Sequence, residues 1–226
     1  LTYLCFNVGN NGPWADARVR QALRYALDMD SMVQLAFSGA AVTADSIYCN
    51  SLSCHVTPDA DHTYSYDVEK AKALLAEAGY PDGFEINLWS NENQSRIDLC
   101  DMIQNAWAQI GVKANVQIME FATELDLIHS GEHDAFIMGF VSAGDDGDFL
   151  HDNFYSTEDY SQNTSGYKNP RYDEIMDKAR TSLDPEVRQE CYAELQDLLN
   201  EELPWIPMAC ATNDYGMRAT LTGLDP

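Results

Sequence analysis

The sequence predicts an α/β domain with a mixed, largely parallel sheet. Short runs rich in β-forming residues recur along the 226 residues, and amphipathic helical patterns separate most of them. Strands that alternate with helices are typical of this class. The chain is 45 % hydrophobic and 11 % aromatic, a composition typical of a globular protein that is long enough to bury a substantial core.

The first third of the chain begins with a strand at residues 1–8, where β-forming residues alternate. The Asn-Asn-Gly-Pro sequence at 10–13 predicts a turn. One helix is expected from Asp16 to Gly39, because apolar residues recur there at helical spacing and the glycine ends the pattern. Residues 40–66 are polar and irregular, and no regular element is expected in them.

The rest of the chain alternates between helices and strands. Asp67 is placed to cap one helix, and prolines stand at the first turn of the last two. Helices are expected at 67–79, 95–110, 123–130, 170–182 and 185–202, and strands at 84–89, 112–119, 136–140 and 204–212.

The chain is strongly acidic, with a formal net charge of −24 and a pI near 4.2. A field of that sign repels phosphate backbones, so a nucleic-acid partner is not expected. No window approaches the ~20 apolar residues that cross a bilayer, and no signal segment is present. Because the chain begins inside a strand and without Met, we expect it to be a domain of a longer protein.

The six cysteines follow no CxxC pattern and no zinc-site spacing. Their even number is compatible with an oxidising compartment. Cys49 and Cys54 flank a short polar loop and are the best candidates for a local disulfide. Cys5 and Cys210 lie in strand-like runs near the two ends, and they could bridge if those strands are neighbours. Cys100 and Cys191 lie in helical patterns and are expected to be buried thiols.

One sequence, His129-Ser-Gly-Glu132-His133, formally matches a zinc-peptidase motif and gives a zinc-dependent hydrolase as an alternative function. That chemistry needs both histidines on one helical face. Gly131 interrupts the motif, so we expect a turn between a helix and a strand. Since no nucleophile elbow or phosphate-binding loop is present either, we expect neither an enzyme nor a cofactor.

Aromatic and polar residues follow the predicted strands of the central region. Trp89, Ser90 and Asn91 end one strand, Phe121 follows the next, and Phe140 ends the one after that. If these strands are parallel neighbours, their carboxyl ends open into one crevice. Aromatic walls would then supply contact area for a ligand.

An acidic loop follows the strand at 136–140. It carries Asp145, Asp146 and Asp148 between glycines and two aromatics, Phe140 and Phe149. Loops after buried strands are where open α/β sheets place ligand chemistry, and this composition suits an amine or a cation. The alternative is an acidic surface turn, in which case the protein would be a non-catalytic surface interaction module.

Several blocks resemble one family in order along nearly the whole chain. They are YLCFN, ADARVRQALRYALDMDSMVQLAFSGAA, KAKALLAEAGYPDGFEINLW, MIQNAWAQIGVKANVQ, SGEHDAFIMGF, NPRYDEIMDKA and QDLLNEELPWIPM. This series resembles the C-terminal lobe of family 5 extracellular solute-binding proteins, the dipeptide- or oligopeptide-binding components of bacterial ABC importers.

The resemblance implies a single ligand-binding lobe over residues 1–226, with a periplasmic-binding-protein type II fold and helices on both faces of the sheet. Its implied partners are a peptide or similar solute, a membrane permease and a first lobe absent from this chain. The implied location is extracellular or periplasmic, with a lipid anchor on the full-length protein. Ligand capture by hinge closure between the lobes is the implied mechanism.

The acidic loop GFVSAGDDGDF resembles a family loop whose first aspartate pairs with the α-amino group of a peptide. Allowing two extra residues, that role falls on Asp145, while a shift of one position would give it to Asp146. Phe140 replaces a tryptophan of the family, and Phe149 replaces a proline.

Other positions of the resemblance concern the rest of the pocket. Phe121 matches an aromatic that lines it in dipeptide binders. Ser90 and Glu92 stand where those proteins have arginine and tyrosine, so a partner for a ligand carboxylate is lost. Glutathione, nickel complexes and oligosaccharides therefore remain open as ligands beside peptides.

Overall fold

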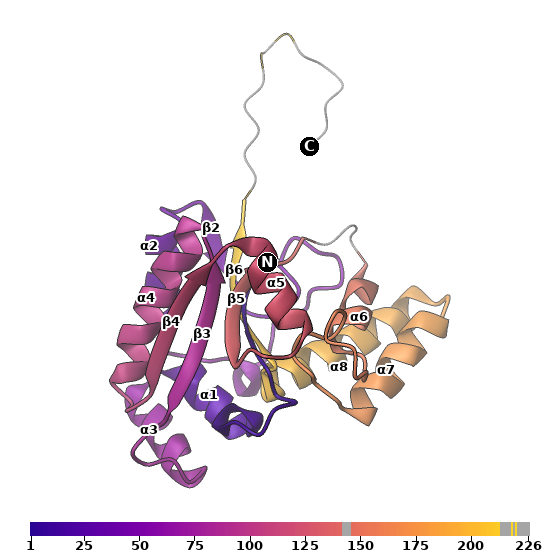
Figure 1. The fold of residues 1–226 in the computed structure, drawn as a ribbon. Coiled ribbons are helices and arrows are strands. Elements are labelled where there is room, and N and C mark those ends of the chain that lie inside the picture. The colour runs from indigo at the N-terminus through magenta and orange to yellow at the C-terminus, as the bar shows by residue number, and fades with distance from the viewer. Residues whose placement is uncertain (142–145, 213–217, 219, 221–226) are drawn as a thin grey trace.

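A six-stranded mixed sheet forms the middle layer of the molecule (Figure 1). The computed structural model describes residues 1–141, 146–212, 218 and 220. Its strand order is β2-β6-β1-β5-β3-β4. The strands are β1 (Thr2–Phe6), β2 (Ala41–Thr43), β3 (Glu85–Asn91), β4 (Lys113–Met119), β5 (Ala135–Gly139) and β6 (Trp205–Ala211).

The sheet is mixed, as predicted, but it is not largely parallel. Strand β3 pairs in parallel with β4 and β5. The other three pairings, β1 with β5, β1 with β6 and β2 with β6, are antiparallel. Helices also separate β1, β2 and β6 from the strands that precede or follow them, so alternation alone does not determine whether two strands pair in parallel, and β2 lies in the segment expected to be irregular.

Helices cover both faces of the sheet (Figure 1). Residues of α1 to α4 pack in one hydrophobic core and residues of α5 to α8 in the other. Strand β1 contributes to both, because Leu4 faces the first core and Tyr3 the second. The helices are α1 (Ala17–Tyr25), α2 (Met29–Ala36), α3 (Val68–Glu77), α4 (Gln94–Ala108), α5 (Phe121–His129), α6 (His151–Phe154), α7 (Pro170–Thr181) and α8 (Pro185–Glu202).

The single helix expected between Asp16 and Gly39 is wrong, since the structure divides it into α1 and α2. Asp28 causes the break by capping α2. Its carboxylate accepts hydrogen bonds from the backbone N–H of Ser31 at 3.3 Å and from the Ser31 hydroxyl at 2.7 Å. An aspartate that satisfies the first turn of a new helix competes with continuation of the previous one.

The other predicted elements are confirmed, with ends that differ by one or two residues. Asp67 caps α3 by accepting a hydrogen bond from the Lys70 N–H at 2.9 Å, and Pro170 and Pro185 open α7 and α8. Among the described residues, no helix combines the length and the apolar character needed to cross a bilayer.

Two turns that contain glycine, at Gly83 and Gly111, lie against each other just before β3 and β4 begin. Gly83 has a φ of +76°, and a Cβ there would lie 2.0 Å from the carbonyl oxygen of Gly111. Gly83→Ala is therefore expected to lower the free energy of unfolding by about 2 to 3 kcal/mol, through left-handed strain and a backbone clash together. Urea unfolding would measure this loss.

Gly79→Ala is the matched control for this substitution. Gly79 also has a positive φ, of +93°, but a Cβ there would meet nothing within 4 Å. It should show only the conformational strain, about 1 kcal/mol. Equal losses at the two positions would contradict the proposed clash between the turns.

Candidate ligand-binding site

The carboxyl ends of four strands meet at one rim of the sheet. Strands β3, β4 and β5 are parallel neighbours, as predicted, and β6 ends beside them because β1 is antiparallel to both β5 and β6. We call this the strand-end rim, and it carries Asn91, Met119, Gly139, Ala211 and, where β1 begins, Thr2. Open α/β sheets bind their ligands at such rims.

A cavity of about 180 Å³ opens at the strand-end rim. Phe140 and Phe149 form one wall, with ring centroids 5.2 Å apart and planes inclined by 18°. Phe149 also meets the edge of Tyr48 at 5.7 Å, and the Tyr48 hydroxyl donates to the carbonyl oxygen of Gly147. The remaining lining residues are Leu1, Ile47, Cys49, Ser51, Leu52, Val141, Cys210 and Ala211.

A disulfide between Cys49 and Cys210 forms part of the cavity wall, with Cα atoms 5.8 Å apart. Both expected pairs, Cys49 with Cys54 and Cys5 with Cys210, are therefore wrong. The pairing of Val42 with Cys210 places β2 beside the end of β6, and the chain after β2 returns over that end. Cys5 instead faces Phe136 and Trp205 across the sheet, away from the rim.

The described part of the acidic loop is anchored to α7 and α8. Asp146 accepts hydrogen bonds from Arg188 at 2.6 and 2.8 Å and from the Tyr192 hydroxyl at 2.6 Å. Partial burial opposes its ionisation, but these bonds and the N–H of Asp148 outweigh it and lower the pKa of Asp146. Asp148 pairs with Arg180 at 3.1 Å. Asp145 lies outside the described residues.

The predicted residues on β3 and α5 differ in their exposure. Trp89 is 8 % exposed and packs in the second core beside the ring of His133, and Ser90 is fully buried. Asn91 lies at the rim and accepts a hydrogen bond from Arg96. Phe121, the first residue of α5, is 47 % exposed and follows the end of β4. Of the predicted residues on β3, α5 and the end of β5, Asn91, Phe121 and Phe140 are thus the ones that are not buried.

Two ionisable side chains beside the rim, Arg96 and Glu124, were not predicted from the sequence. The Arg96 guanidinium lies against Gly139, where a Cβ would be 2.6 Å from Nη2, and it donates to Asn91 at 2.9 Å. Glu124 is fully buried, and neither carboxylate oxygen has a hydrogen-bond partner among the residues that the structure describes. Burial raises the pKa of Glu124 to about 7, against the opposing effect of Arg96.

One signal for Glu124 was present in the sequence. It lies four residues before Ile128, so the two share a helical face, and Ile128 is buried. A glutamate on the buried face of an amphipathic helix is unusual enough to indicate a special environment. Arg96 had no comparable signal, because its contacts come from β3 and β5.

The His129 to His133 segment forms the expected turn between a helix and a strand. Helix α5 ends at His129, Gly131 has a φ of +75°, and β5 begins at Ala135. His129 is exposed, whereas His133 is fully buried and burial lowers its pKa to about 4. The described residues contain no group of three potential metal ligands, and the two histidines do not share a helical face.

A cavity at the strand-end rim of an α/β sheet is the arrangement in which folds of this class bind their ligands. The chain belongs to the bacterial extracellular solute-binding proteins, family 5: the family model described as "Bacterial extracellular solute-binding proteins, family 5 Middle" matches residues 1–162. The members of this family are extracellular or periplasmic binding proteins.

Two curated relatives and one solved structure show what the chain is similar to. It is 34 % identical to heme-binding protein A of Haemophilus influenzae, covering 92 % of this chain and 39 % of the relative. It is 33 % identical to the dipeptide-binding protein of Escherichia coli, covering 99 % and 43 %. The chain thus spans about two-fifths of the length of these relatives.

The structural comparison supports the same fold. A dipeptide-binding protein from Pseudoalteromonas sp. SM9913, solved in complex with Met-Leu, superposes with a TM-score of 0.87 at 26 % identity, over 93 % of this chain and 42 % of that one. The predicted fold class, a periplasmic-binding-protein type II-like α/β fold with a mixed sheet and helices on both faces, is confirmed.

Proposed function

We propose that this chain is one lobe of a two-lobed binding protein that captures a peptide and delivers it to an ABC permease. The observation that carries the proposal is the cavity at the strand-end rim, walled by the stacked rings of Phe140 and Phe149. Its 180 Å³ is below the range of about 300 to 1,000 Å³ for complete small-molecule sites. A second lobe closing over the rim would supply the remaining walls.

The chemistry of the rim suits a short peptide. The stacked rings offer an apolar surface to a side chain, and the backbone at open strand ends offers donors and acceptors. Asp146 and Asp148 are occupied by Arg188, Tyr192 and Arg180. Their pairing supports the assignment of the amine-binding role to Asp145.

We further propose that the role is binding without catalysis, in an extracellular or periplasmic setting with a lipid anchor on the full-length protein. The net charge of −24 disfavours nucleic acid as a partner. Heme and glutathione, for which other relatives are named, are the competing ligand classes. Mass spectrometry of the ligand that co-purifies with the full-length protein separates these ligands. Heme would overturn the proposal, and so would glutathione, whose γ-linked glutamate distinguishes it from an ordinary peptide.

Phe140→Ala in the full-length protein is expected to weaken peptide binding about ten-fold, because it removes half of the stacked wall. Asp145→Asn should weaken it by a similar or larger factor through loss of a charge-assisted hydrogen bond. Isothermal titration calorimetry with Met-Leu measures both effects. Leu183→Ala, at a 99 % exposed position between α7 and α8, is the control. Unchanged affinity in both rim variants would exclude this cavity as the peptide site.

A further inference from the structure

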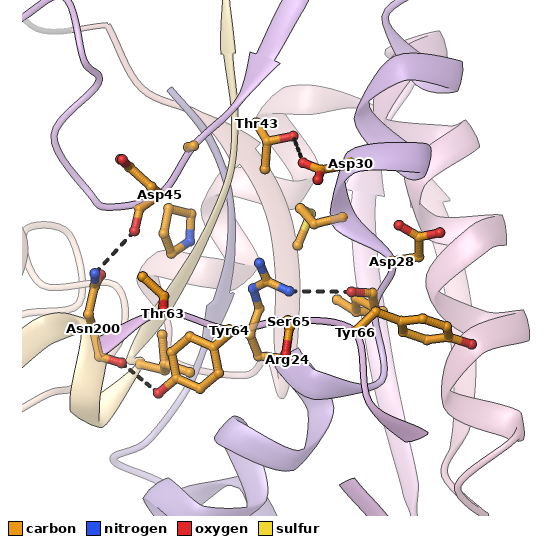
Figure 2. Close-up of a pocket in the computed structure, with 15 residues that line it drawn as sticks. Arg24, Asp28, Asp30, Thr43, Asp45, Thr63, Tyr64, Ser65, Tyr66 and Asn200 are labelled. Carbon is orange, nitrogen blue, oxygen red and sulfur yellow. Dashed lines mark hydrogen bonds between the residues drawn. The ribbon is translucent and has the colours of Figure 1, made fainter. Parts of the chain in front are cut away.

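A second cavity, of about 330 Å³, lies between α2, β2 and the segment that precedes α3 (Figure 2). It shares no lining residue with the cavity at the strand-end rim. Its β6 residue is Pro207, in the middle of the strand, and its other neighbours include Leu203, just before β6 begins. The cavity therefore lies toward the opposite end of β6 from the rim.

A buried arginine points into this cavity. Arg24 is 8 % exposed, and Figure 2 shows its guanidinium in the centre of the lining residues. Its one hydrogen bond within the described residues goes to the carbonyl oxygen of Leu27, at 3.3 Å, and no carboxylate there forms an ion pair with it. The ring of Tyr64 lies 5.8 Å from the guanidinium carbon. Most of the N–H groups of Arg24 thus have no acceptor in the described part of the chain.

Carboxylates line the same cavity without pairing with Arg24. Asp30 accepts a hydrogen bond from the Thr43 hydroxyl at 2.6 Å, and Asp45 pairs with His55 at 2.9 Å, each through Oδ1. The Oδ2 atoms of both have no hydrogen bond within the described residues. Figure 2 shows Asp30 on the side of the cavity nearer to the guanidinium of Arg24 and Asp45 farther from it, so a cationic and an anionic region coexist in one cavity.

We propose that this cavity is a second small-molecule site and that it binds a small zwitterion, a free α-amino acid. The forked N–H groups of Arg24 would take the carboxylate, and Oδ2 of Asp30 would take the ammonium group. The side chain would then lie against apolar lining residues such as Leu27 and Pro207.

Simpler ligands fit the cavity less well. A plain anion would meet one arginine and three aspartates, Asp28, Asp30 and Asp45, so the lining as a whole repels it. A plain cation would leave the buried guanidinium of Arg24 without an acceptor, which is costly. Residues that could enclose a metal ion are not gathered anywhere in the described chain. A molecule with both charges satisfies both regions.

Titration of the isotopically labelled chain with glycine, L-alanine and L-leucine, followed by amide chemical shifts, tests this proposal. Saturable shifts are expected in residues 24–30, 43–45 and 63–66. Propionate and ethylamine, which each carry one of the two charges of alanine, should bind at least ten-fold more weakly than alanine. The proposal would be overturned if no amino acid bound saturably, or if the shifts were confined to the strand-end rim. It would also be overturned if propionate or ethylamine bound as tightly as alanine.

Two variants and a control add a second test. Arg24→Gln should weaken amino-acid binding at least ten-fold. Arg24 is buried, so its replacement could disturb folding, and a second variant is needed. Ser65→Trp serves this purpose, because Ser65 is an exposed lining residue and an indole there would occupy the cavity. Arg18→Gln removes an exposed arginine from the same helix and should leave binding unchanged. Full binding by a folded Ser65→Trp variant would overturn the assignment.

Discussion

Replacing Cys49 and Cys210 together by serine is expected to lower the free energy of unfolding by about 4 to 5 kcal/mol. The disulfide joins residues 161 positions apart, and in the chain-entropy model a loop of that length restricts the unfolded state by about 5 kcal/mol at 25 °C. The two cysteines are also the link between the segment after β2 and the end of β6. Urea unfolding of the oxidised protein and the double variant would measure the loss.

Reduction of the unmodified protein provides the control for this prediction. Dithiothreitol should lower the stability of the wild-type chain to that of the double variant and should leave the double variant unchanged. If the reductant has no effect on the wild-type unfolding midpoint, the bond does not contribute as proposed. The comparison separates loss of the bond from any effect of the serine hydroxyls.

The parts of the fold that follow from local patterns could be predicted. The apolar spacing of α4 and the capping aspartate of α3 place those helices within two residues of their observed ends. The break at Asp28 could not be placed, because the apolar spacing continues through it and the capping bond depends on a single side chain. The partners in the disulfide were predicted wrongly for a different reason: the bond depends on the pairing of β2, a three-residue strand, with β6.

The candidate site likewise has a part that local sequence patterns predict and a part that they do not. Parallel order in the centre of the sheet follows from alternation, and this order brings Asn91 and Phe140 to one rim as predicted. The partners of Asp146 could not be predicted, because Arg188 and Tyr192 lie more than 40 residues along the chain, on a helix whose docking is a tertiary event. Arg96 could not be predicted either, because its contacts come from β3 and β5, which lie outside the local pattern of α4.

Glu124→Gln is expected to remove a pH dependence from the stability of the wild-type chain. Burial raises the pKa of Glu124 from its usual 4.5 to about 7 in the folded protein. Between these values the folded chain holds a proton that the unfolded chain has lost, so the contribution of Glu124 to stability falls as pH rises from about 4.5 to 7. Buried His133, whose pKa is lowered to about 4, contributes in the opposite direction, so the effect of Glu124 is the difference between the wild-type and Glu124→Gln profiles. The decrease from Glu124 alone corresponds to at most about 3 kcal/mol, and solvent screening of the carboxylate reduces it. The glutamine variant should lack this decrease and be the more stable protein at pH 8.

Arg96→Gln tests the origin of the same effect. The charge of Arg96 opposes the rise in the pKa of Glu124, so its removal should raise that pKa further and extend the loss of stability to higher pH. Glu132→Gln, at an exposed position just after α5, controls for the loss of one acidic charge and should keep the wild-type decrease. Urea midpoints measured from pH 4 to 9 would compare the four proteins. If the urea midpoint of Glu124→Gln varied with pH as that of the wild type does, the carboxyl group of Glu124 would be ionised in the folded protein at little cost. The proposed effect of burial on its pKa would then be wrong.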